Sequence, residues 1–223
     1  MDERPTPESG LRIGRAAFLG TVAAGLAGIA IAPRLDRFWT RASEALLSDG
    51  GWRIYSVASP MPRFDPEVYR LSIGGAVRRP ADLGWDEVAA LPAERQVSDF
   101  HCVTGWSVQD VRWRGVRGTA LSALVEPLPE ARYVTFASME EPYTDQLTLE
   151  QFHLPDVLLA THMDDAPLSR EHGAPLRLVV PAMYGYKSVK WVRAISFDTE
   201  PHTGYWEARG YSTDAWVGDS NGL

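Results

Sequence analysis

The chain has 223 residues, 45% of them hydrophobic, and a formal net charge of -7 at pH 7. This apolar content is enough to build a folded core and excludes an intrinsically disordered chain. Residues 1–50 hold six acidic and six basic side chains, so the whole negative excess lies in residues 51–223. Nucleic-acid binding depends on neutralising phosphates with basic side chains, and this acidic balance excludes it.

An uncharged apolar stretch occupies residues 16–32, between Arg15 and Pro33. It falls short of the ~20 apolar residues that span a membrane comfortably, and it is typical of a signal peptide or a marginal anchor. The string GRAAFLG resembles a twin-arginine export motif whose second arginine is alanine, and residues 30–32 offer a small-x-small cleavage signature. We therefore expect residues 1–50 to be an export signal or membrane anchor followed by an amphipathic connector. The protein is then periplasmic or otherwise extracytoplasmic, and anchored by residues 16–32 if that signal is not cleaved.

Residues 51–223 are predicted to form one domain that is rich in short strands. Alternating apolar residues between glycine and proline turns predict strands at residues 69–73, 96–100, 132–137, 157–162, 176–180 and 190–197. Helices are expected at residues 85–91, at 119–124 and after a capping box formed by Thr148 and Gln151. Because the helices do not alternate strictly with the strands, we predict a strand-rich α+β fold with a mixed sheet rather than a doubly wound parallel sheet.

Cys102 is the only cysteine of the chain and lies in the segment DFHCVTGWS. A single cysteine cannot close an intramolecular disulfide or form a Cys-x-x-Cys metal clip. Three roles remain open for it: a small buried apolar side chain, a nucleophile, or the one thiolate ligand of a soft metal.

Residues 172–191, HGAPLRLVVPAMYGYKSVKW, combine a glycine turn with basic and hydroxyl side chains. Arg177, Lys187 and Lys190 supply positive charge and Ser188 can donate a hydrogen bond, which together are the parts of an anion-binding site. The glycines do not have the spacing of a P-loop, so an ATPase is not favoured. Taken singly, the lysines also fit a solvated strand edge, and the arginine an ordinary surface ion pair.

Four motifs follow one another along the chain: FHCVTGWS at residues 100–107, WRGV at 113–116, HGAPLRLVVP at 172–181 and YGYKSVKW at 184–191. With them the chain resembles, over residues 52–210, the bacterial branch of the sulfite oxidase-type molybdopterin-dependent oxidoreductases. That branch includes the periplasmic methionine sulfoxide reductase catalytic subunit. The resemblance implies a sulfite oxidase-like molybdopterin-binding fold and Mo-molybdopterin, a molybdenum pyranopterin, as the cofactor.

The resemblance also implies roles for individual residues. Cys102 matches the catalytic position whose thiolate binds molybdenum directly, and thiolates are suitable ligands for soft metals. Arg177 matches a position that holds the phosphate and pterin of the cofactor. The other positions that the resemblance places against the cofactor are Tyr55, Ser56, His101, Ser138, His172, Ser188, Val189 and Lys190.

The two histidines of this set depart from the methionine sulfoxide reductase branch. His172 stands where that branch has asparagine, so it can hydrogen-bond the pterin but not in the same way. His101 stands where the branch usually has arginine, which places a titratable group near the metal that can bond the pterin or tune the metal centre. His101 can alternatively be satisfied within the strand pair that carries it.

The implied activity is oxygen-atom transfer on a small sulfur-oxo or related oxo substrate, with the redox chemistry supplied by the cofactor. A haem-attachment motif needs two cysteines, so we expect a separate redox partner, either a haem protein or a quinone-linked membrane subunit. The immunoglobulin-like dimerisation domain of the family has no counterpart in the sequence, and we predict a monomer. Aromatic residues between Tyr205 and Trp216 can line a substrate mouth or pack the tail onto the core.

Two alternative functions stay open. A non-catalytic pterin-binding or electron-chain accessory protein of the same fold would carry the same motifs. A cysteine nucleophile with His101 or His172 as base has the groups that acyl transfer requires. In an extended segment, however, His101 points to the face opposite Cys102, which disfavours that reaction.

Overall fold

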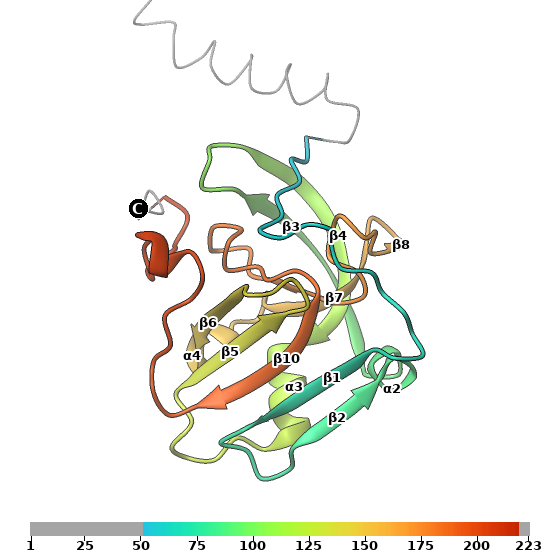
Figure 1. Ribbon diagram of the computed structural model, residues 1–223, viewed down its shortest axis with the longest axis vertical. Coiled ribbons are helices and arrows are strands. Elements are labelled where there is room, and N and C mark those ends of the chain that lie inside the picture. Colours follow the sequence, from blue (N-terminus) through green and yellow to red (C-terminus); the bar gives the residue numbers. More distant parts are fainter. Residues whose placement is uncertain (1–50, 219–223) are drawn as a thin grey trace, which may run out of the picture. The chain divides into compact units, whose positions relative to one another are not determined.

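The computed structural model describes residues 51–218, and the predicted export signal or anchor with its connector lies outside them. Two five-stranded sheets make up the described part (Figure 1). The first sheet has the order β2-β1-β10-β5-β6. Its strands are β1 (Arg70–Gly75), β2 (Ala81–Gly84), β5 (Tyr133–Ser138), β6 (Thr144–Thr148) and β10 (Val192–Asp198). β1 and β10 run parallel while the other neighbours are antiparallel, so the sheet is mixed, as predicted.

The central strand β10 organises the core of the first sheet. Ile195 of β10 lies opposite Ile73 of β1 and Phe136 of β5. Residues opposite one another in a sheet point to the same face, and these three side chains are at most 2% exposed. Strands from the beginning and the end of the described chain therefore meet at the centre of one buried face.

The second sheet has the order β3-β4-β7-β8, with β9 also paired to β7. Its strands are β3 (Ala93–His101), β4 (Ser107–Arg117), β7 (Leu158–Met163), β8 (Ala166–Pro167) and β9 (Arg177–Val179). All of its neighbouring strands are antiparallel. β3 and β4 form a long, curved hairpin (Figure 1), and the short segment that joins them carries Cys102.

Short helices link the strands: α2 (Trp85–Ala89), α3 (Gly118–Val125), α4 (Leu149–Phe152) and the 3-10 helix η1 (Glu207–Arg209). The predicted capping box begins α4. The Thr148 hydroxyl accepts a hydrogen bond from the Gln151 N–H at 3.1 Å, and the Gln151 side chain accepts one from the Thr148 N–H at 2.8 Å. Among residues 51–218, no helix combines the length and the apolar character that crossing a membrane requires.

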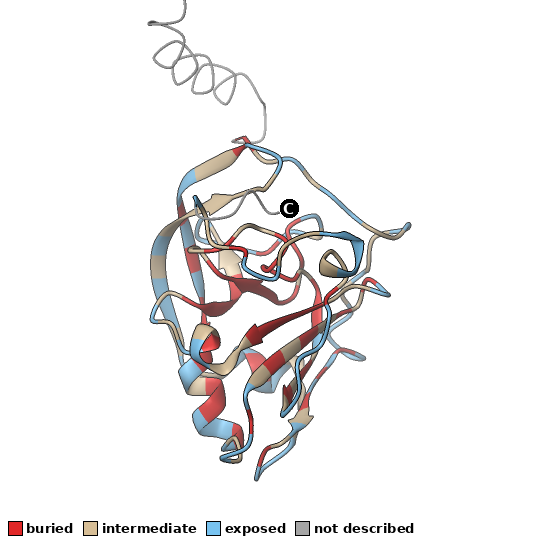
Figure 2. Cartoon of the chain, turned by 90° about the vertical axis from the view of Figure 1, so that its left-hand side faces the viewer, coloured by how far each residue is buried: buried red, intermediate tan, exposed pale blue. Residues whose placement is uncertain are grey.

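Buried side chains form two clusters on opposite faces of β7. Leu159 belongs to the larger cluster, which also contains Ile195 and Phe136 of the first sheet. Leu158 belongs to the smaller one, together with Trp113 of β4. Adjacent residues of a strand point to opposite faces, so β7 is buried on both sides. Figure 2 shows these buried stretches inside the domain, with the exposed residues along the loops and the outer hairpin.

The predicted strands are all present, with ends that differ by one to three residues, and the three predicted helices are α2, α3 and α4. This confirms the strand-rich α+β class. Four strands of the structure lie outside the predicted ranges: β2, β4, β6 and β8. In β4, buried Val111 and Trp113 alternate with exposed Arg112 and Arg114, which is the pattern of a strand with one buried face.

Candidate active site

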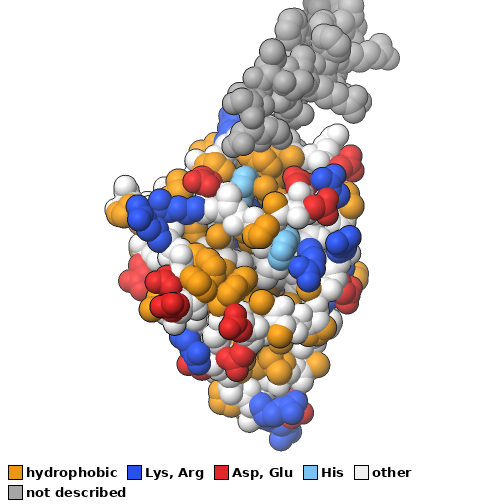
Figure 3. Space-filling view, turned by 90° about the vertical axis from the view of Figure 1, so that its right-hand side faces the viewer, with side chains coloured by type: hydrophobic (Ala, Val, Ile, Leu, Met, Phe, Trp, Pro, Cys, Tyr) orange, Lys and Arg blue, Asp and Glu red, His pale blue; other side chains and the backbone are white. Residues whose placement is uncertain are grey.

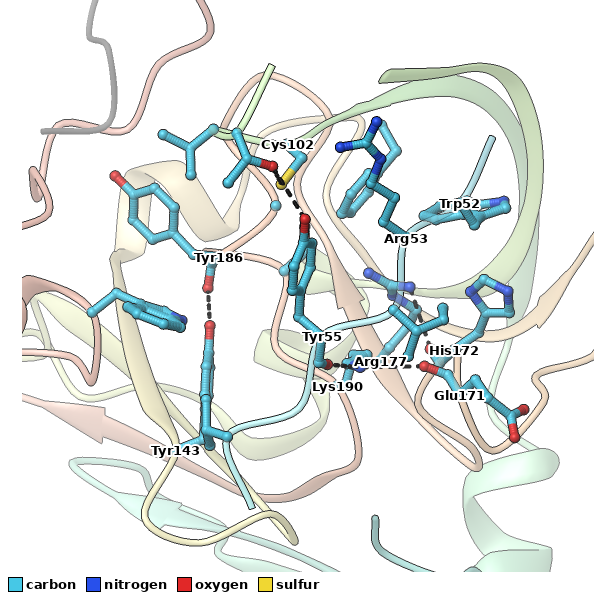
Figure 4. A pocket seen from close by; sticks show the side chains of 18 of the residues that line it. Trp52, Arg53, Tyr55, Cys102, Tyr143, Glu171, His172, Arg177, Tyr186 and Lys190 are labelled. Atoms are coloured by element: carbon cyan, nitrogen blue, oxygen red, sulfur yellow. Dashed lines mark hydrogen bonds between the residues drawn. The ribbon is translucent and has the colours of Figure 1, made fainter. Parts of the chain in front are cut away.

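A cavity of about 250 Å³ lies between the tip of the β3–β4 hairpin and the loops that flank β9 (Figure 4). Its walls include most of the predicted site residues: Tyr55, Cys102, Ser138, His172, Arg177, Ser188 and Lys190. Tyr55 and Lys190, which touch one another there, are 135 residues apart in the sequence. The tertiary fold, and not a local motif, therefore assembles the cavity.

Cys102 lies in a tight turn at the hairpin tip. The Cys102 N–H donates to the Trp106 carbonyl at 2.9 Å, and the Gly105 N–H donates to the Cys102 carbonyl at 3.0 Å. Gly105 has a φ of 89°, a left-handed conformation that glycine adopts without steric cost. The turn presents the thiol to the cavity, where Sγ lies 3.2 Å from the Thr104 hydroxyl. Within residues 51–218, the hydrogen-bonding partner of Sγ is this hydroxyl and not a basic side chain that could activate the thiol as a nucleophile.

Arg177, at the start of β9, is the most deeply buried cation of the cavity wall, at 2% exposure. Its guanidinium is held between two aromatic rings, 5.3 Å from the Phe100 centroid and 5.2 Å from that of Trp113. Nη1 donates to the His172 carbonyl at 3.3 Å, while Nε has no partner among the described residues. Burial lowers the pKa of Arg177 to about 10, because the cation has little compensation here.

Lys190 lies beside Arg177 and is also poorly compensated. Its Nζ donates to the Tyr55 carbonyl at 2.7 Å and to the Glu171 carbonyl at 3.2 Å, and it lies 4.0 Å from the centroid of the Trp191 ring. Burial, and then the charge of Arg177, lower the pKa of Lys190 to about 7. In the described part of the chain neither cation forms a salt bridge. This end of the cavity is therefore suited to an anion.

Tyr55 connects the two ends of the cavity, as Figure 4 shows. Its hydroxyl lies 3.5 Å from that of Thr104, next to Cys102, while its carbonyl accepts the hydrogen bond from Lys190. The side chain is 51% exposed. Tyr55 is thus placed to touch a bound molecule along its length, through both backbone and ring.

Glu140 lines the cavity although no sequence motif indicates it. Its buried carboxylate accepts hydrogen bonds from the N–H groups of Val57 at 2.7 Å and Ala58 at 3.1 Å, and from the Ser56 hydroxyl. These bonds fix residues 56–58 against the end of β5. Glu140 therefore positions Tyr55, and Ser56 takes part in that support without lining the cavity.

An aromatic wall closes another side of the cavity; it consists of Tyr143, Tyr186, Trp206 and Tyr211. The Tyr143 hydroxyl donates to the Tyr186 carbonyl at 2.6 Å, and the Tyr186 hydroxyl donates to the Ser212 carbonyl at 2.7 Å. Burial raises the pKa of both Tyr143 and Tyr186, so both phenols stay neutral. Trp206 and Tyr211 line the cavity, and together with Trp216 they also pack against the larger core cluster, as the second of the two predicted roles requires.

The remaining predicted residues lie beside the cavity rather than in its wall. His101 Nδ1 is 2.8 Å from the Ser107 hydroxyl, across the hairpin, and the Val189 side chain is 1% exposed in the larger core cluster. Ser188 does line the cavity, but its hydroxyl accepts a hydrogen bond from the Val180 N–H at 3.1 Å. Ser138 is similarly engaged, because its hydroxyl donates to the Lys190 carbonyl at 2.8 Å.

Lys187 is neither a cation of the cavity nor a solvated lysine. Its Nζ is buried between Asp145 and Glu207. The positive charge that the sequence assigns to this loop therefore reaches the cavity wall through Lys190 and Arg177.

Comparison with known proteins connects this cavity to a family. Residues 58–206 match the family described as oxidoreductase molybdopterin binding domain. The uncharacterized oxidoreductase YuiH of Bacillus subtilis (strain 168) is 40% identical over 154 residues, which cover 68% of this chain and 77% of that protein. The protein-methionine-sulfoxide reductase catalytic subunit MsrP of Campylobacter jejuni is 30% identical over 161 residues, which cover 65% of this chain. They cover 54% of that subunit, so the chain spans about half of its length.

The sulfane dehydrogenase SoxCD from Paracoccus pantotrophus has the same fold, with a TM-score of 0.60 and 23% identity. The likeness covers 70% of this chain and 43% of that one. The family match includes the hairpin with Cys102 and the loops with Arg177 and Lys190. The chain therefore belongs to the molybdopterin-binding oxidoreductase family, with the sulfite oxidase-like fold that its four motifs indicate.

Proposed function

We propose that this protein is a molybdenum-pterin enzyme that transfers an oxygen atom to or from a small sulfur-oxo substrate, with Cys102 as the thiolate ligand of the metal. One observation carries the proposal. The thiol of Cys102 and two cations that form no salt bridge within residues 51–218, Arg177 and Lys190, lie on the walls of one cavity.

The side chains of this cavity fit a molybdopterin. The buried Nε of Arg177 lacks a hydrogen-bond acceptor in the described part of the chain, and an unpaired buried donor costs about 1–3 kcal/mol. A pterin phosphate would accept that bond and neutralise both Arg177 and Lys190. Cys102 supplies the soft donor that a metal of this cofactor requires.

When it is bound, the cofactor supplies the two-electron oxygen-atom transfer chemistry. The protein positions the reactants. Arg177 and Lys190 would hold the anionic end, Cys102 would hold the metal, and the neutral aromatic wall would line the remaining side. Tyr55, fixed by the support of Glu140, contributes its carbonyl and its ring to the same cavity.

The aromatic wall favours an organic sulfoxide, or the corresponding thioether, over an inorganic anion as the substrate. Sulfur makes favourable contacts with aromatic rings, worth about 0.3–1.5 kcal/mol each, and Tyr143, Tyr186, Trp206 and Tyr211 offer several rings. The relative from Campylobacter jejuni, a methionine-sulfoxide reductase subunit, supports the same substrate class.

We further propose a location and a partner for this enzyme. The export-like segment at residues 14–20 supports an extracytoplasmic protein. Because a chain with one cysteine cannot bind haem through the usual two thioether bonds, a separate haem protein or a quinone-linked membrane subunit exchanges electrons with it.

Two other functions are distinguishable from this one. Acyl transfer by a cysteine–histidine pair is opposed by the geometry, because the bonded neighbour of Sγ is Thr104, while His172 packs edge-on against Trp52 with centroids 4.8 Å apart. A non-catalytic pterin-binding protein would have the same cavity, so turnover must be measured directly.

The test is metal and pterin analysis of protein made in a host that synthesises molybdopterin, together with turnover on sulfoxides, sulfite and oxyanions using a dye donor or acceptor. We expect wild-type protein to carry molybdenum and Cys102→Ser to lose both metal and turnover. His101→Gln, which alters the adjacent side chain outside the cavity, should keep its metal. Wild-type protein without molybdenum would refute the proposal. Bound cofactor without turnover would favour the accessory role, and an active Cys102→Ser would exclude thiolate ligation.

A further inference from the structure

A row of basic side chains crosses the outer face of the second sheet. Arg95 of β3 lies directly opposite Arg114 of β4, and Arg114 lies directly opposite His162 of β7. Directly opposed residues project from the same face of a sheet, and like charges in such pairs are destabilising. We call Arg95, Arg114 and His162 the basic row; its two arginines place like charges side by side in the isolated protein.

No acidic side chain of the described residues neutralises the basic row. The salt bridges of residues 51–218 include neither Arg95 nor Arg114, and both are exposed. The neighbouring Arg112, in contrast, is compensated by Asp164 and Asp165. Burial, and then the charge of Arg114, lower the pKa of His162. The positive charge of the two arginines is therefore left for an external anion.

The basic row lines a groove of about 470 Å³, which also contains Val97, 60% exposed, and Asp165, the partner of Arg112. Arginine is enriched in protein interfaces, and the rim of an interface is polar and accessible to solvent. Figure 3 shows Lys and Arg side chains beside a histidine on one face of the domain. This basic groove stands out on a chain whose net charge is -7.

Trp113 connects the floor of this groove to the cofactor cavity. It lines the groove between the two exposed arginines of β4, and its indole is 1% exposed. On the inner side its ring lies 5.2 Å from the guanidinium carbon of Arg177, which belongs to the cavity wall. Adjacent residues of a strand point to opposite faces, so the backbone of β4 and the Trp113 ring lie between the basic row and the anion-binding end of the cavity.

We infer that the basic row is the docking site for an acidic surface of the redox protein that exchanges electrons with this enzyme. The inference rests on the proposed function, since only a redox enzyme needs such a partner. Reduction of one sulfoxide to a thioether and water consumes two electrons and two protons. The docked protein supplies both electrons, one at a time, and is oxidised, while the protons come from water. Opposite charges steer such encounters and raise association rates.

The experiment uses flavodoxin, an acidic flavoprotein, as the probe partner of the cofactor-loaded enzyme. Its binding is titrated at low and high salt with wild-type protein and with Arg95→Glu and Arg114→Glu. The control is Arg78→Glu, which makes the same charge change at an exposed arginine outside any salt bridge of residues 51–218. Sulfoxide turnover is measured with reduced flavodoxin and, separately, with the cationic donor methyl viologen.

We expect each variant of the basic row to bind flavodoxin at least about tenfold more weakly than wild type and to be reduced by it more slowly. The control Arg78→Glu should bind flavodoxin and be reduced by it like wild type. Arg114→Glu should unfold at the same or a higher temperature than wild type, because it replaces a like-charge pair with an opposite-charge pair. Equal binding by Arg114→Glu and Arg78→Glu would overturn the inference. Binding to phosphatidylglycerol vesicles is measured with the same variants. If the substitutions weaken binding to the vesicles but not to flavodoxin, the face is a lipid contact and the inference is also overturned. Absence of turnover both with methyl viologen and with a dye acceptor would refute the proposed function instead, whatever the binding result.

Discussion

Nζ of Lys187 lies 2.6 Å from Oδ1 of Asp145, and the two side chains are only 4% and 2% exposed. The same Nζ lies 2.6 Å from Oε1 of Glu207, which is 3% exposed. Burial lowers the pKa of Lys187, and the two carboxylates outweigh this effect and raise it, so the lysine is held as a cation. One buried charge therefore fastens η1, which lies within the aromatic wall, to β6 of the first sheet.

Replacing Lys187 with methionine should destabilise the protein strongly. The substitution keeps the volume but leaves two buried carboxylates without a cation, and breaking a buried pair in this way costs about 3–5 kcal/mol. Urea unfolding measures the loss. Arg70→Met is the matched control, because the pair that Arg70 forms with Asp82 is more than half exposed and such pairs contribute about 0–1 kcal/mol. Equal losses in the two variants would contradict the assigned role of the cluster.

The Asp145 carboxyl should make the stability fall as the pH rises towards neutrality. Burial raises the pKa of Asp145 from 3.8 to about 7, with Lys187 opposing and Glu207 adding to the shift. Between pH 3.8 and about 7 the Asp145 carboxyl is protonated in the folded protein but ionised in the unfolded chain. The stability that this carboxyl contributes is therefore fully present below pH 3.8 and is lost as the pH rises through about 7. The unfolding free energy of wild type should therefore fall relative to that of Asp145→Asn as the pH rises across this interval. A constant difference would show that this carboxyl does not titrate there.

Cofactor uptake should weaken with rising pH because of Lys190. The pKa of this ammonium is about 7 in the cavity, and a bound phosphate would raise it again. Above pH 7, loading requires uptake of a proton, so the affinity of the apoprotein for molybdopterin should fall as the pH rises. Reconstitution at several pH values measures it. Lys190→Arg, which stays charged, should lack this pH dependence. If the cofactor affinity of Lys190→Arg falls with pH as steeply as that of wild type, another group causes the dependence.

Gly185→Ala should impair both stability and cofactor content. A Cβ at this position would lie 2.3 Å from Cζ of Phe100, whose ring stacks on Arg177. Overpacking of this kind costs about 1–3 kcal/mol, and any shift of Phe100 displaces the guanidinium. Gly74→Ala is the control, since nothing lies within 4 Å of its added Cβ. Thermal unfolding measures the stability, and pterin fluorescence measures the cofactor content. Wild-type values of both for Gly185→Ala would show that the Phe100 ring can move away from the added methyl group without cost.

The strands of the first sheet were predictable where local pattern and burial agree. β1 and β10 alternate and end at turns, so their positions follow from residues 69–73 and 190–197. Their parallel pairing does not follow, because it joins segments more than 100 residues apart and no local signal specifies a partner strand. β4 lies outside the predicted ranges although buried Val111 and Trp113 alternate with exposed Arg112, because the glycine of WRGV interrupts the alternation before the strand ends.

Part of the candidate site was predictable from local motifs, and part depends on the tertiary fold. Motifs indicated Cys102, Arg177 and Lys190, which do line the cavity. Glu140 carries no motif, because its function is to accept backbone hydrogen bonds from a segment more than 80 residues away. The sequence also could not separate Lys187 from Lys190, although one is paired in the protein interior and the other is not. That difference depends on Glu207, which only the tertiary fold brings near.

The position of β10 has a consequence for the order of assembly. This strand lies between β1 and β5, so without residues 192–198 the first sheet exists only as two separate hairpins. Lys190 and three residues of the aromatic wall, Tyr186, Trp206 and Tyr211, also come from this late part of the chain. A ribosome-bound chain that has not yet released these residues has no complete cavity. Insertion of a cofactor must therefore follow synthesis of nearly the whole domain, and an exported protein of this kind would have to be loaded and folded before it leaves the compartment where the cofactor is made.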